Sequence, residues 1–419
     1  MRIMIKKVLL GLVILAFGSG GLVYWLQQDD ELSAQTKALI DADYAFQSDL
    51  KQHPFFYAWG MDAKADVEPE SLGRLRYYEQ WQQQGKSLSS ANKAAPMQIQ
   101  QLQKHPLSAK QKQVLDELNQ VLLQTPEQSE SFIRQHQSQF VAMFATEQFA
   151  IQRYLHWLNS TDYVSLLLPA DGVLPDYQTL RDLHLLHAVQ LSLKPKDESK
   201  TALLQYISAL QNMQGQKLSM IEKYIMQNFI WQSLDMLNLK AQHASVHVAP
   251  LTQHALSLRQ SMRYEVSQNA HSFQSLAVPK GMSDWQYRLV YLPNRSLNQQ
   301  VKDIEPYIAL SELSYLDFLQ QYEHFQPEKR SKYVLKNSVG NILAQVAVVD
   351  WRPYALRSRI LDNKIRVFNA VQKQESVEEL NKNREGYDYY QKGHQLCLKQ
   401  PFPQQKLPAY LAQDTCMPI

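Results

Sequence analysis

HPFFYAWGMDAKADVEPESLG, residues 53–73, is the stretch that decides how the chain begins to fold. Its aromatic cluster consists of Phe55, Phe56, Tyr57 and Trp59, and Gly60 follows. Pro54 would end a preceding helix, and Gly60 would permit a turn. Burying the rings against other helices would contribute several kcal/mol at about 25 cal/mol per Å² of apolar area. We interpret the segment as a structural plug, with an exposed patch for a membrane surface or a partner as the alternative.

An apolar run upstream of this segment determines the predicted compartment. VLLGLVILAFGSGGLVYWL, residues 8–26, is uncharged and spans about 28 Å as a helix, close to the hydrocarbon thickness of a bilayer. Positive charges precede it, and Tyr24 and Trp25 lie at its far end, where interfacial aromatic residues belong. We predict a cytoplasmic tail over residues 1–7, an inner-membrane anchor over residues 8–26 and a periplasmic location for the rest. A cleaved signal peptide is the alternative, although its apolar region would be shorter.

The composition favours an all-α fold behind this anchor. Only 13 of the 419 residues are Gly, which argues against a turn-dense β protein or a Gly-rich nucleotide fold. Apolar residues recur at helical spacing through most of the chain. We predict one large helical periplasmic domain over residues 27–382 with few short extended segments; a division into two lobes near residue 170 stays open. The formal charge of +3 does not indicate a nucleic acid partner.

The least helical part of this domain is predicted at residues 271–298. It contains Pro279, Gly281 and Pro293, which interrupt helices. We predict a long ordered loop there, with a short strand at residues 286–292. Whether the loop has a function stays open.

Both cysteines lie in the tail, residues 383–419, which is polar and rich in proline. Cys397 and Cys416 are 19 positions apart, and outside the membrane such a pair is expected to form one disulfide. Closing a loop of that size would contribute about 3 kcal/mol in the chain-entropy treatment. We therefore predict a Pro-rich tail stapled by this disulfide, with two unpaired thiols as the alternative.

The sequence contains no complete motif for catalysis or metal binding. His184 and His187 form an HLLH pair on a helical face with leucines. Zinc normally needs a third protein ligand, so the preferred interpretation is a pair of histidines packed at a helix–helix seam. Ser90 and Lys93 match an S-x-x-K pattern without its companion motifs, and HExxH, GxSxG and GxGxxG are missing. We predict no catalytic residue, no metal and no other cofactor.

A charge pattern near the C-terminus is the candidate interaction surface. Basic residues recur at seven-residue intervals at Arg352, Arg359, Arg366 and Lys373. This spacing keeps them on one helical face with a drift of about 20° per heptad. Asp362 compensates part of the charge at helical spacing. A solvated helix face is the simpler interpretation, and a docking surface for an acidic partner is the functional one.

Several blocks of the chain resemble a family of uncharacterised single-pass membrane-anchored proteins of Gram-negative bacteria. The first block is the stretch at residues 53–73. The others follow in the same order: LRDLHLLHAVQ (180–190), KLSMIEKYIMQNFI (217–230), YLPNRSLNQQV (291–301) and YALRSRILDNKIRVFNAV (354–371). The resemblance implies a single anchor and a mostly helical ectodomain in the cell envelope, and it carries no function with it.

These patterns predict an inner-membrane-anchored protein that binds or scaffolds another envelope component and is not an enzyme. One alternative is an envelope hydrolase acting on cell-wall or lipid substrates, with carboxylates that come together only in the fold. Another is a membrane-tethered chaperone for secreted proteins, although the Arg-x-x-Phe-Asp-Tyr signature of lipase foldases is missing. The oligomeric state and the identity of the partner stay open.

Overall fold

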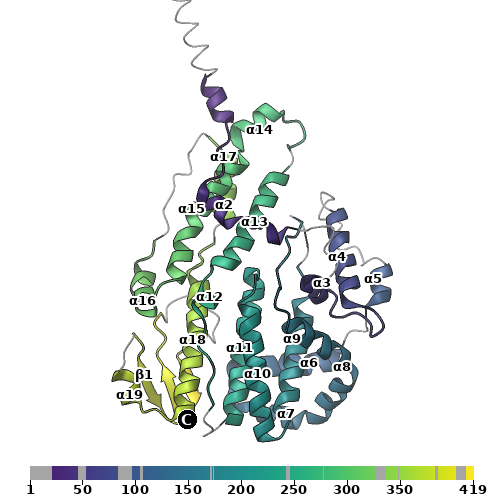
Figure 1. Cartoon of the computed structure of the whole chain (residues 1–419), viewed down its shortest axis with the longest axis vertical. Helices are drawn as coiled ribbons and strands as arrows, with labels where there is room; N and C mark the ends of the chain where they lie inside the picture. The colour runs from purple at the N-terminus through teal and green to yellow at the C-terminus, as the bar shows by residue number, and fades with distance from the viewer. Residues whose placement is uncertain are drawn as a thin grey trace, which may run out of the picture. The chain divides into compact units, whose positions relative to one another are not determined.

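The chain folds into two compact units. Most of its elements are helices, as Figure 1 shows. The computed structural model describes residues 21–45, 53–83, 97–103, 107–169, 172, 174–241, 246–276, 278–326, 336–347, 349–382, 386–402 and 412–419. The smaller unit combines residues 1–42, 265–307 and 326–351, and the larger unit contains the rest. This division does not fall near residue 170, because segments far apart in the sequence pack with the residues that follow the predicted anchor.

The smaller unit is built from helices. Residues 21–27 are helical, and the other helices with most of their length here are α2 (Ala34–Leu39), α13 (Arg259–Ser275), α14 (Asp284–Val290), α15 (Pro293–Ser311) and α17 (Ser338–Ala347). The predicted loop with a strand at residues 286–292 is wrong, because α14 occupies the place of the strand. The side chain of Gln286 accepts the backbone N–H of Ser283 at 3.0 Å, which caps the start of α14.

The predicted anchor lies mainly outside the described residues, since these begin at residue 21. Within the described part of the chain, no helix combines the length and the apolar character needed to cross a membrane. The anchor therefore stays a prediction from the sequence.

The larger unit contains a helical bundle and a small sheet. Its helices are α3 (Pro54–Trp59), α4 (Pro69–Gln83), α5 (Met97–Leu102), α6 (Ala109–Gln124), α7 (Ser129–Gln135), α8 (Gln137–Leu158), α9 (Tyr177–Ser192), α10 (Lys196–Gln214), α11 (Met220–Ala241), α12 (Gln253–Leu256), α16 (Tyr315–His324), α18 (Arg352–Lys373) and α19 (Val377–Lys382). Short 3-10 turns occur at η1 (Ala42–Tyr44) and η3 (Pro126–Gln128). The predicted all-α class holds for most of the described chain.

Helices α11 and α18 form the centre of this unit and are buried on several faces. Polar pairs join them across their seam. The Lys364 ammonium lies 2.6 Å from the Asp235 carboxylate, the Gln227 amide donates to Ser358 at 2.8 Å, and the Gln372 amide donates to Asn238 at 3.1 Å. Because unpaired polar groups in such a seam would be costly, these pairs fix the register of the two helices.

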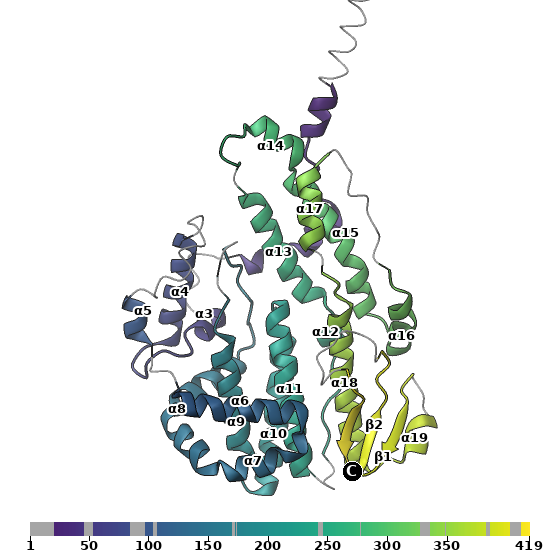
Figure 2. The same cartoon turned by 180° about the vertical axis from the view of Figure 1, so that it is seen from behind.

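The C-terminal tail is not separate from the larger unit. It contributes strands β1 (Tyr389–Lys392), β2 (Gln395–Leu398) and β3 (Thr415–Pro418), which form an antiparallel sheet packed beside α18 (Figure 2). Cys397 and Cys416 lie directly opposite each other on β2 and β3 and are joined by a disulfide, as predicted. The sheet itself was not predicted, because the polar tail offers only short strands with few alternating apolar residues.

Candidate functional site

A groove of about 620 Å³ in the larger unit is the candidate binding site. It is formed by α7, the turn between α9 and α10, and the last turn of α11. Four cationic side chains line it, and they are Arg134, Lys194, Lys196 and Lys240. Glu130 is the one carboxylate in the lining, so the groove carries an excess of three positive charges. We refer to it below as the basic groove.

The carboxylate of Glu130 orients two of the four cations. It accepts a hydrogen bond from Arg134 at 2.7 Å and another from the Lys240 ammonium at 2.9 Å. These two hydrogen bonds lower the pKa of Glu130, so it stays ionised. Across the groove, the exposed Lys194 ammonium contacts Glu198 at 2.9 Å. The cations are therefore held in place but only partly neutralised.

Apolar side chains complete the lining of the basic groove. They come from all three of its segments: Ile133, Leu193, Met236 and Leu239. A ligand that combines acidic groups with apolar side chains would match both parts of the surface. Sequence reasoning missed this site because its cations lie in three segments separated by about 40 residues or more and form no local motif.

The predicted interaction surface on α18 does not exist as an exposed basic stripe. Arg359 is buried, 5% exposed, and donates hydrogen bonds to the backbone carbonyls of Ser311, at 3.1 Å, and Leu313. Arg352 is half-buried and donates to the Phe325 carbonyl at 3.2 Å. These guanidinium groups hydrogen-bond to backbone carbonyls at the C-terminal ends of α15 and α16, so the prediction of a docking surface is wrong for them.

The other two basic residues of the predicted surface lie closer to solvent. Arg366 pairs with Asp362 at 2.9 Å, and its guanidinium stacks over the Tyr387 ring at 4.8 Å. Lys373 is exposed and lies 3.5 Å from Glu375. Both line a pocket of about 700 Å³ that also contains two carboxylates. Since its charges nearly cancel, this pocket is a weaker candidate than the basic groove for an acidic ligand.

The aromatic segment is a structural plug inside the larger unit. Phe55, Phe56 and Trp59 are buried, and their rings surround Tyr77 of α4 at centroid distances of 5.4 to 5.7 Å. Tyr57 is half-buried and its ring lies 5.1 Å from that of His156. The alternative of an exposed patch is therefore wrong for the three buried rings.

Gly60 has a different role from the predicted one. Its φ of −106° is open to any residue, so the turn does not require glycine. A Cβ atom at Gly60 would instead lie 1.6 Å from the Pro69 carbonyl oxygen, and one at Gly73 would lie 1.8 Å from the Phe56 carbonyl oxygen. The two glycines let α3 and α4 approach backbone to backbone, and this approach brings the aromatic rings together.

His184 and His187 lie in the seam of α9 with its neighbours, as predicted. Both are buried, and the His184 ring stacks on Phe229 of α11 at 4.0 Å while its Nδ1 lies 2.7 Å from the hydroxyl of Tyr206 on α10. Burial lowers the pKa of His184 to about 3 and that of His187 to about 4. Among the residues that the structure describes, no group of three His, Cys, Asp or Glu side chains could hold a metal ion.

A second cavity of about 230 Å³ gathers four carboxylates, and we call it the acidic pocket. They are Asp62, Glu147, Asp176 and Asp182. The Asp62 carboxylate accepts hydrogen bonds from both terminal guanidinium nitrogens of Arg76, at 2.7 and 2.8 Å. Burial raises the pKa of Asp182, although Arg181 lies 2.6 Å from it and opposes the shift. The S-x-x-K match at Ser90 and Lys93 lies outside the described residues.

No protein-family model matches the chain, and neither a curated protein nor a solved structure does. The resemblance to membrane-anchored proteins of Gram-negative bacteria therefore stays a prediction. The function has to be argued from the chemistry of the described surfaces.

Proposed function

We propose that the chain is a single-pass inner-membrane protein whose periplasmic body binds an acidic, partly apolar segment of another envelope protein in the basic groove, without catalysing a reaction. One observation carries this proposal. Four cations from three distant segments surround one groove whose lining also contains apolar side chains. Cations placed around an apolar surface favour acidic ligands and speed their encounter.

The proposed location rests on the N-terminal sequence and on the disulfide. The uncharged run at residues 8–26 follows positive charges, which favours a cytoplasmic N-terminus. The bond between Cys397 and Cys416 suits an oxidising compartment such as the periplasm. Both observations support placement of the helical body outside the inner membrane.

Binding would use charge and apolar contact together. Lys194 and Lys196 are both exposed, and an acidic side chain entering beside them would compete with Glu198 for the Lys194 ammonium. Apolar side chains of the same segment would then cover the half-buried Leu193 and Leu239. Affinity should fall as salt rises, because exposed charges are screened.

Reversing the charge at one edge of the groove tests this proposal. We expect the full-length chain in lipid nanodiscs to bind a fluorescein-labelled peptide of alternating Glu and Leu more tightly than the same peptide with Gln for Glu. In the double variant Lys194→Glu/Lys196→Glu, the Kd for the Glu peptide should rise about tenfold or more, since the lining changes from an excess of three positive charges to an excess of one negative charge. Fluorescence anisotropy measures both Kd values.

The matched control changes two exposed lysines outside the groove. Lys110→Glu/Lys392→Glu alters the net charge by the same amount, so its Kd should stay close to that of the wild type. Equal affinity for the Glu and Gln peptides would contradict the proposal. So would equal weakening in both double variants, because binding would then follow net charge alone.

The acidic pocket supports a second candidate function, a hydrolase of cell-wall or lipid substrates. Its specific observation is the raised pKa of Asp182 in a cavity that also contains the buried Glu147. A carboxyl group whose pKa is raised by burial is better suited to act as a general acid than one with an ordinary pKa.

Dye-labelled peptidoglycan sacculi provide the test of this second candidate. If it is correct, the full-length protein should release soluble dye, and Asp182→Asn or Glu147→Gln should lower the rate about a hundredfold or more. Asp197→Asn is the control, because Asp197 lies on the surface and outside the pocket. Retention of the wild-type rate in both pocket variants would eliminate the pocket as a catalytic site.

A further inference from the structure

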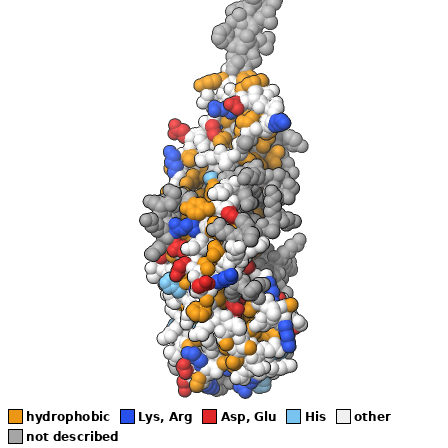
Figure 3. All heavy atoms as spheres, turned by 90° about the vertical axis from the view of Figure 1, so that its right-hand side faces the viewer, with side chains coloured by type: hydrophobic (Ala, Val, Ile, Leu, Met, Phe, Trp, Pro, Cys, Tyr) orange, Lys and Arg blue, Asp and Glu red, His pale blue; other side chains and the backbone are white. Residues whose placement is uncertain are grey.

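The smaller unit exposes an unusual amount of apolar surface. Among the described residues, twelve of the eighteen exposed large hydrophobic side chains belong to this unit, which contains only about a quarter of the chain. They come from three segments, residues 22–25, 276–285 and 339–349. Hydrophobic side chains appear at the top of Figure 3, at the height of α14 in Figure 1. Exposed apolar surface on this scale usually marks a contact with a membrane or another molecule.

Helix α17 shows the pattern most clearly. Val339, Ile342 and Val346 are 42%, 57% and 75% exposed, and their spacing of three and four residues places them on one face. Ala344 is buried on another face. The helix thus turns an apolar face outward, the reverse of a surface helix in water.

The other two segments belong to the same surface. Helix α14, with Trp285 53% exposed, packs against α17. The side chain of Gln27 donates to the Trp285 carbonyl at 3.3 Å, and the Lys336 ammonium lies 4.8 Å from the centre of the Trp25 ring. Residues 21–27, residues 278–290 with α14, and α17 therefore form one apolar surface of the smaller unit, which we call the apolar face.

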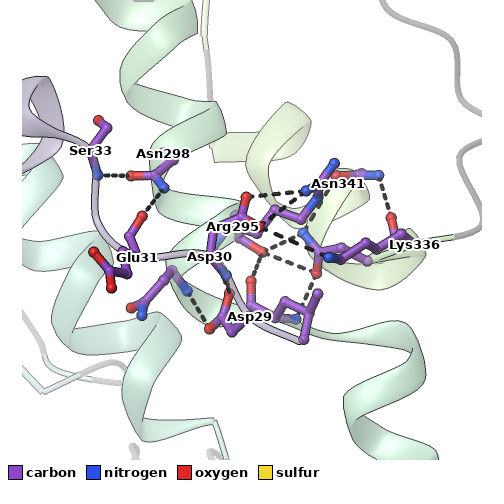
Figure 4. A network of polar contacts seen from close by, with 12 residues as sticks. Asp29, Asp30, Glu31, Ser33, Arg295, Asn298, Lys336 and Asn341 are labelled. Atoms are coloured by element: carbon purple, nitrogen blue, oxygen red, sulfur yellow. Dashed lines mark hydrogen bonds and ion pairs between the residues drawn. The ribbon is translucent and has the colours of Figure 1, made fainter. Parts of the chain in front are cut away.

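A polar network connects the residues that directly follow residue 27 to α15 (Figure 4). The Asp29 carboxylate accepts the backbone N–H groups of Asn294 and Arg295 at 3.0 and 2.9 Å, in the first turn of α15. Asp30 lies 3.1 Å from the Arg295 guanidinium. The chain that leaves residues 21–27 is therefore fixed to the unit and does not hang as a free linker.

The amide of Asn298 extends this network by one helical turn. It donates to the Glu31 carbonyl at 2.8 Å, and its oxygen accepts the Ser33 N–H at 2.9 Å (Figure 4). Contacts with the first two turns of α15 therefore hold residues 29–33 against this helix. These contacts thereby fix how residues 21–27 join the rest of the smaller unit.

We propose that the apolar face rests in the lipid interface of the membrane that holds the predicted anchor, as a second membrane contact of this protein. The inference rests on the proposed membrane location. The predicted anchor would reach the bilayer surface at Tyr24 and Trp25, which are themselves part of the face. Exposed Lys280 and Arg288 in the same segments would meet anionic headgroups. Apolar and aromatic side chains bordered by cations are typical of interfacial membrane contacts.

Spin labels on single introduced cysteines measure this contact directly. Both native cysteines are bonded to each other, so one added thiol can be labelled selectively in the full-length chain. Labels replace Ile342, Val346 and Met282 on the apolar face, Leu22 in the predicted anchor and the exposed Phe149 of the larger unit as control. The protein is reconstituted in vesicles of phosphatidylethanolamine and phosphatidylglycerol.

We expect labels at residues 342, 346 and 282 to be at least about threefold less accessible to a water-soluble nickel complex than the label at 149, and more accessible to oxygen. Nickel accessibility equal to that of residue 149, with Leu22 in lipid, would overturn the membrane contact and leave the anchor intact. Protection from both reagents would also overturn it, because a protein partner or second copy would then cover the face. A water-exposed Leu22 label would refute the anchor and the inference together.

Discussion

Acidification from pH 6.5 to 4.5 is expected to remove about 5 kcal/mol from the free energy of unfolding of the larger unit through His184 and His187. Both histidines are buried, and burial lowers the pKa of His184 to about 3 and that of His187 to about 4. In the unfolded chain both would titrate near pH 6.5. Each group contributes at most about 1.4 kcal/mol per pH unit, and less near pH 6.5, where the unfolded imidazole is half protonated, so the loss for two groups over two units lies somewhat below the limit of about 5.6 kcal/mol.

The direction of this change in unfolding free energy follows from proton binding. Between the folded and unfolded pKa values, the two imidazoles bind protons in the unfolded chain and stay neutral in the folded chain, so stability falls as the pH falls. Well above pH 6.5 both states carry neutral imidazoles and the effect disappears. Buried Lys223, with its pKa lowered by burial to about 7, and Lys364, lowered to about 8, act above this window. They make stability rise as pH increases towards 10.5 and do not contribute between pH 6.5 and 4.5.

Substitution separates these histidines from the other titrating groups. Burial also lowers the pKa values of His53 and His271, so the test compares slopes between variants. His184→Gln and His187→Gln should each reduce the slope of unfolding free energy against pH by up to about 1.4 kcal/mol per unit. His247→Gln, at an exposed position, should leave it unchanged. Denaturant unfolding at each pH gives the slope. Hydrogen exchange of the α9 amides shows whether the loss of stability occurs at this helix. An unchanged slope in both buried variants would contradict the prediction.

The sequence predicts the helical class and the disulfide because both depend on local or simple signals. Apolar residues at helical spacing and two cysteines in one tail suffice for those predictions. The role of Arg359 could not be predicted, because cations at seven-residue intervals form the same sequence pattern whether they face water or backbone carbonyls. The structure directs this guanidinium to Ser311 and Leu313, which are about 48 residues away in the chain. Hydrogen-bond partners this distant in the sequence cannot be identified from the residues of the helix that contacts them.

The basic groove and α14 illustrate two further limits. The groove unites cations between residues 134 and 240, so only the packing of α7, α9, α10 and α11 creates it. At α14, the alternation of apolar and polar residues indicated a strand. The cap between Ser283 and Gln286 and the packing against α17 favour a helix instead. Tertiary contacts override weak local preference in such short segments.

Gly60→Ala and Gly73→Ala are each expected to destabilise the larger unit by about 3 kcal/mol or more. An added Cβ atom would lie 1.6 Å from the Pro69 carbonyl oxygen in the first case and 1.8 Å from the Phe56 carbonyl oxygen in the second. Both obstacles are backbone atoms, so no side chain can rotate away to make room. Helices α3 and α4 must separate, and the rings of Phe55, Phe56 and Trp59 then lose their contacts with Tyr77.

This prediction also distinguishes the two roles considered for Gly60. If the residue served only to permit a turn at φ −106°, alanine would cost well under 1 kcal/mol, since that conformation is open to it. Gly215→Ala is the matched control, because a Cβ there would lie 3.3 Å from its nearest neighbour at φ −76°. Denaturant unfolding of the three variants, with the near-ultraviolet dichroism of the aromatic cluster as a local readout, compares the two roles. If Gly60→Ala and Gly215→Ala proved equally stable, the close approach of α3 and α4 would have to be abandoned as the reason for glycine. A large loss confined to Gly60 and Gly73 would establish the backbone contact as the feature that holds the aromatic plug in place.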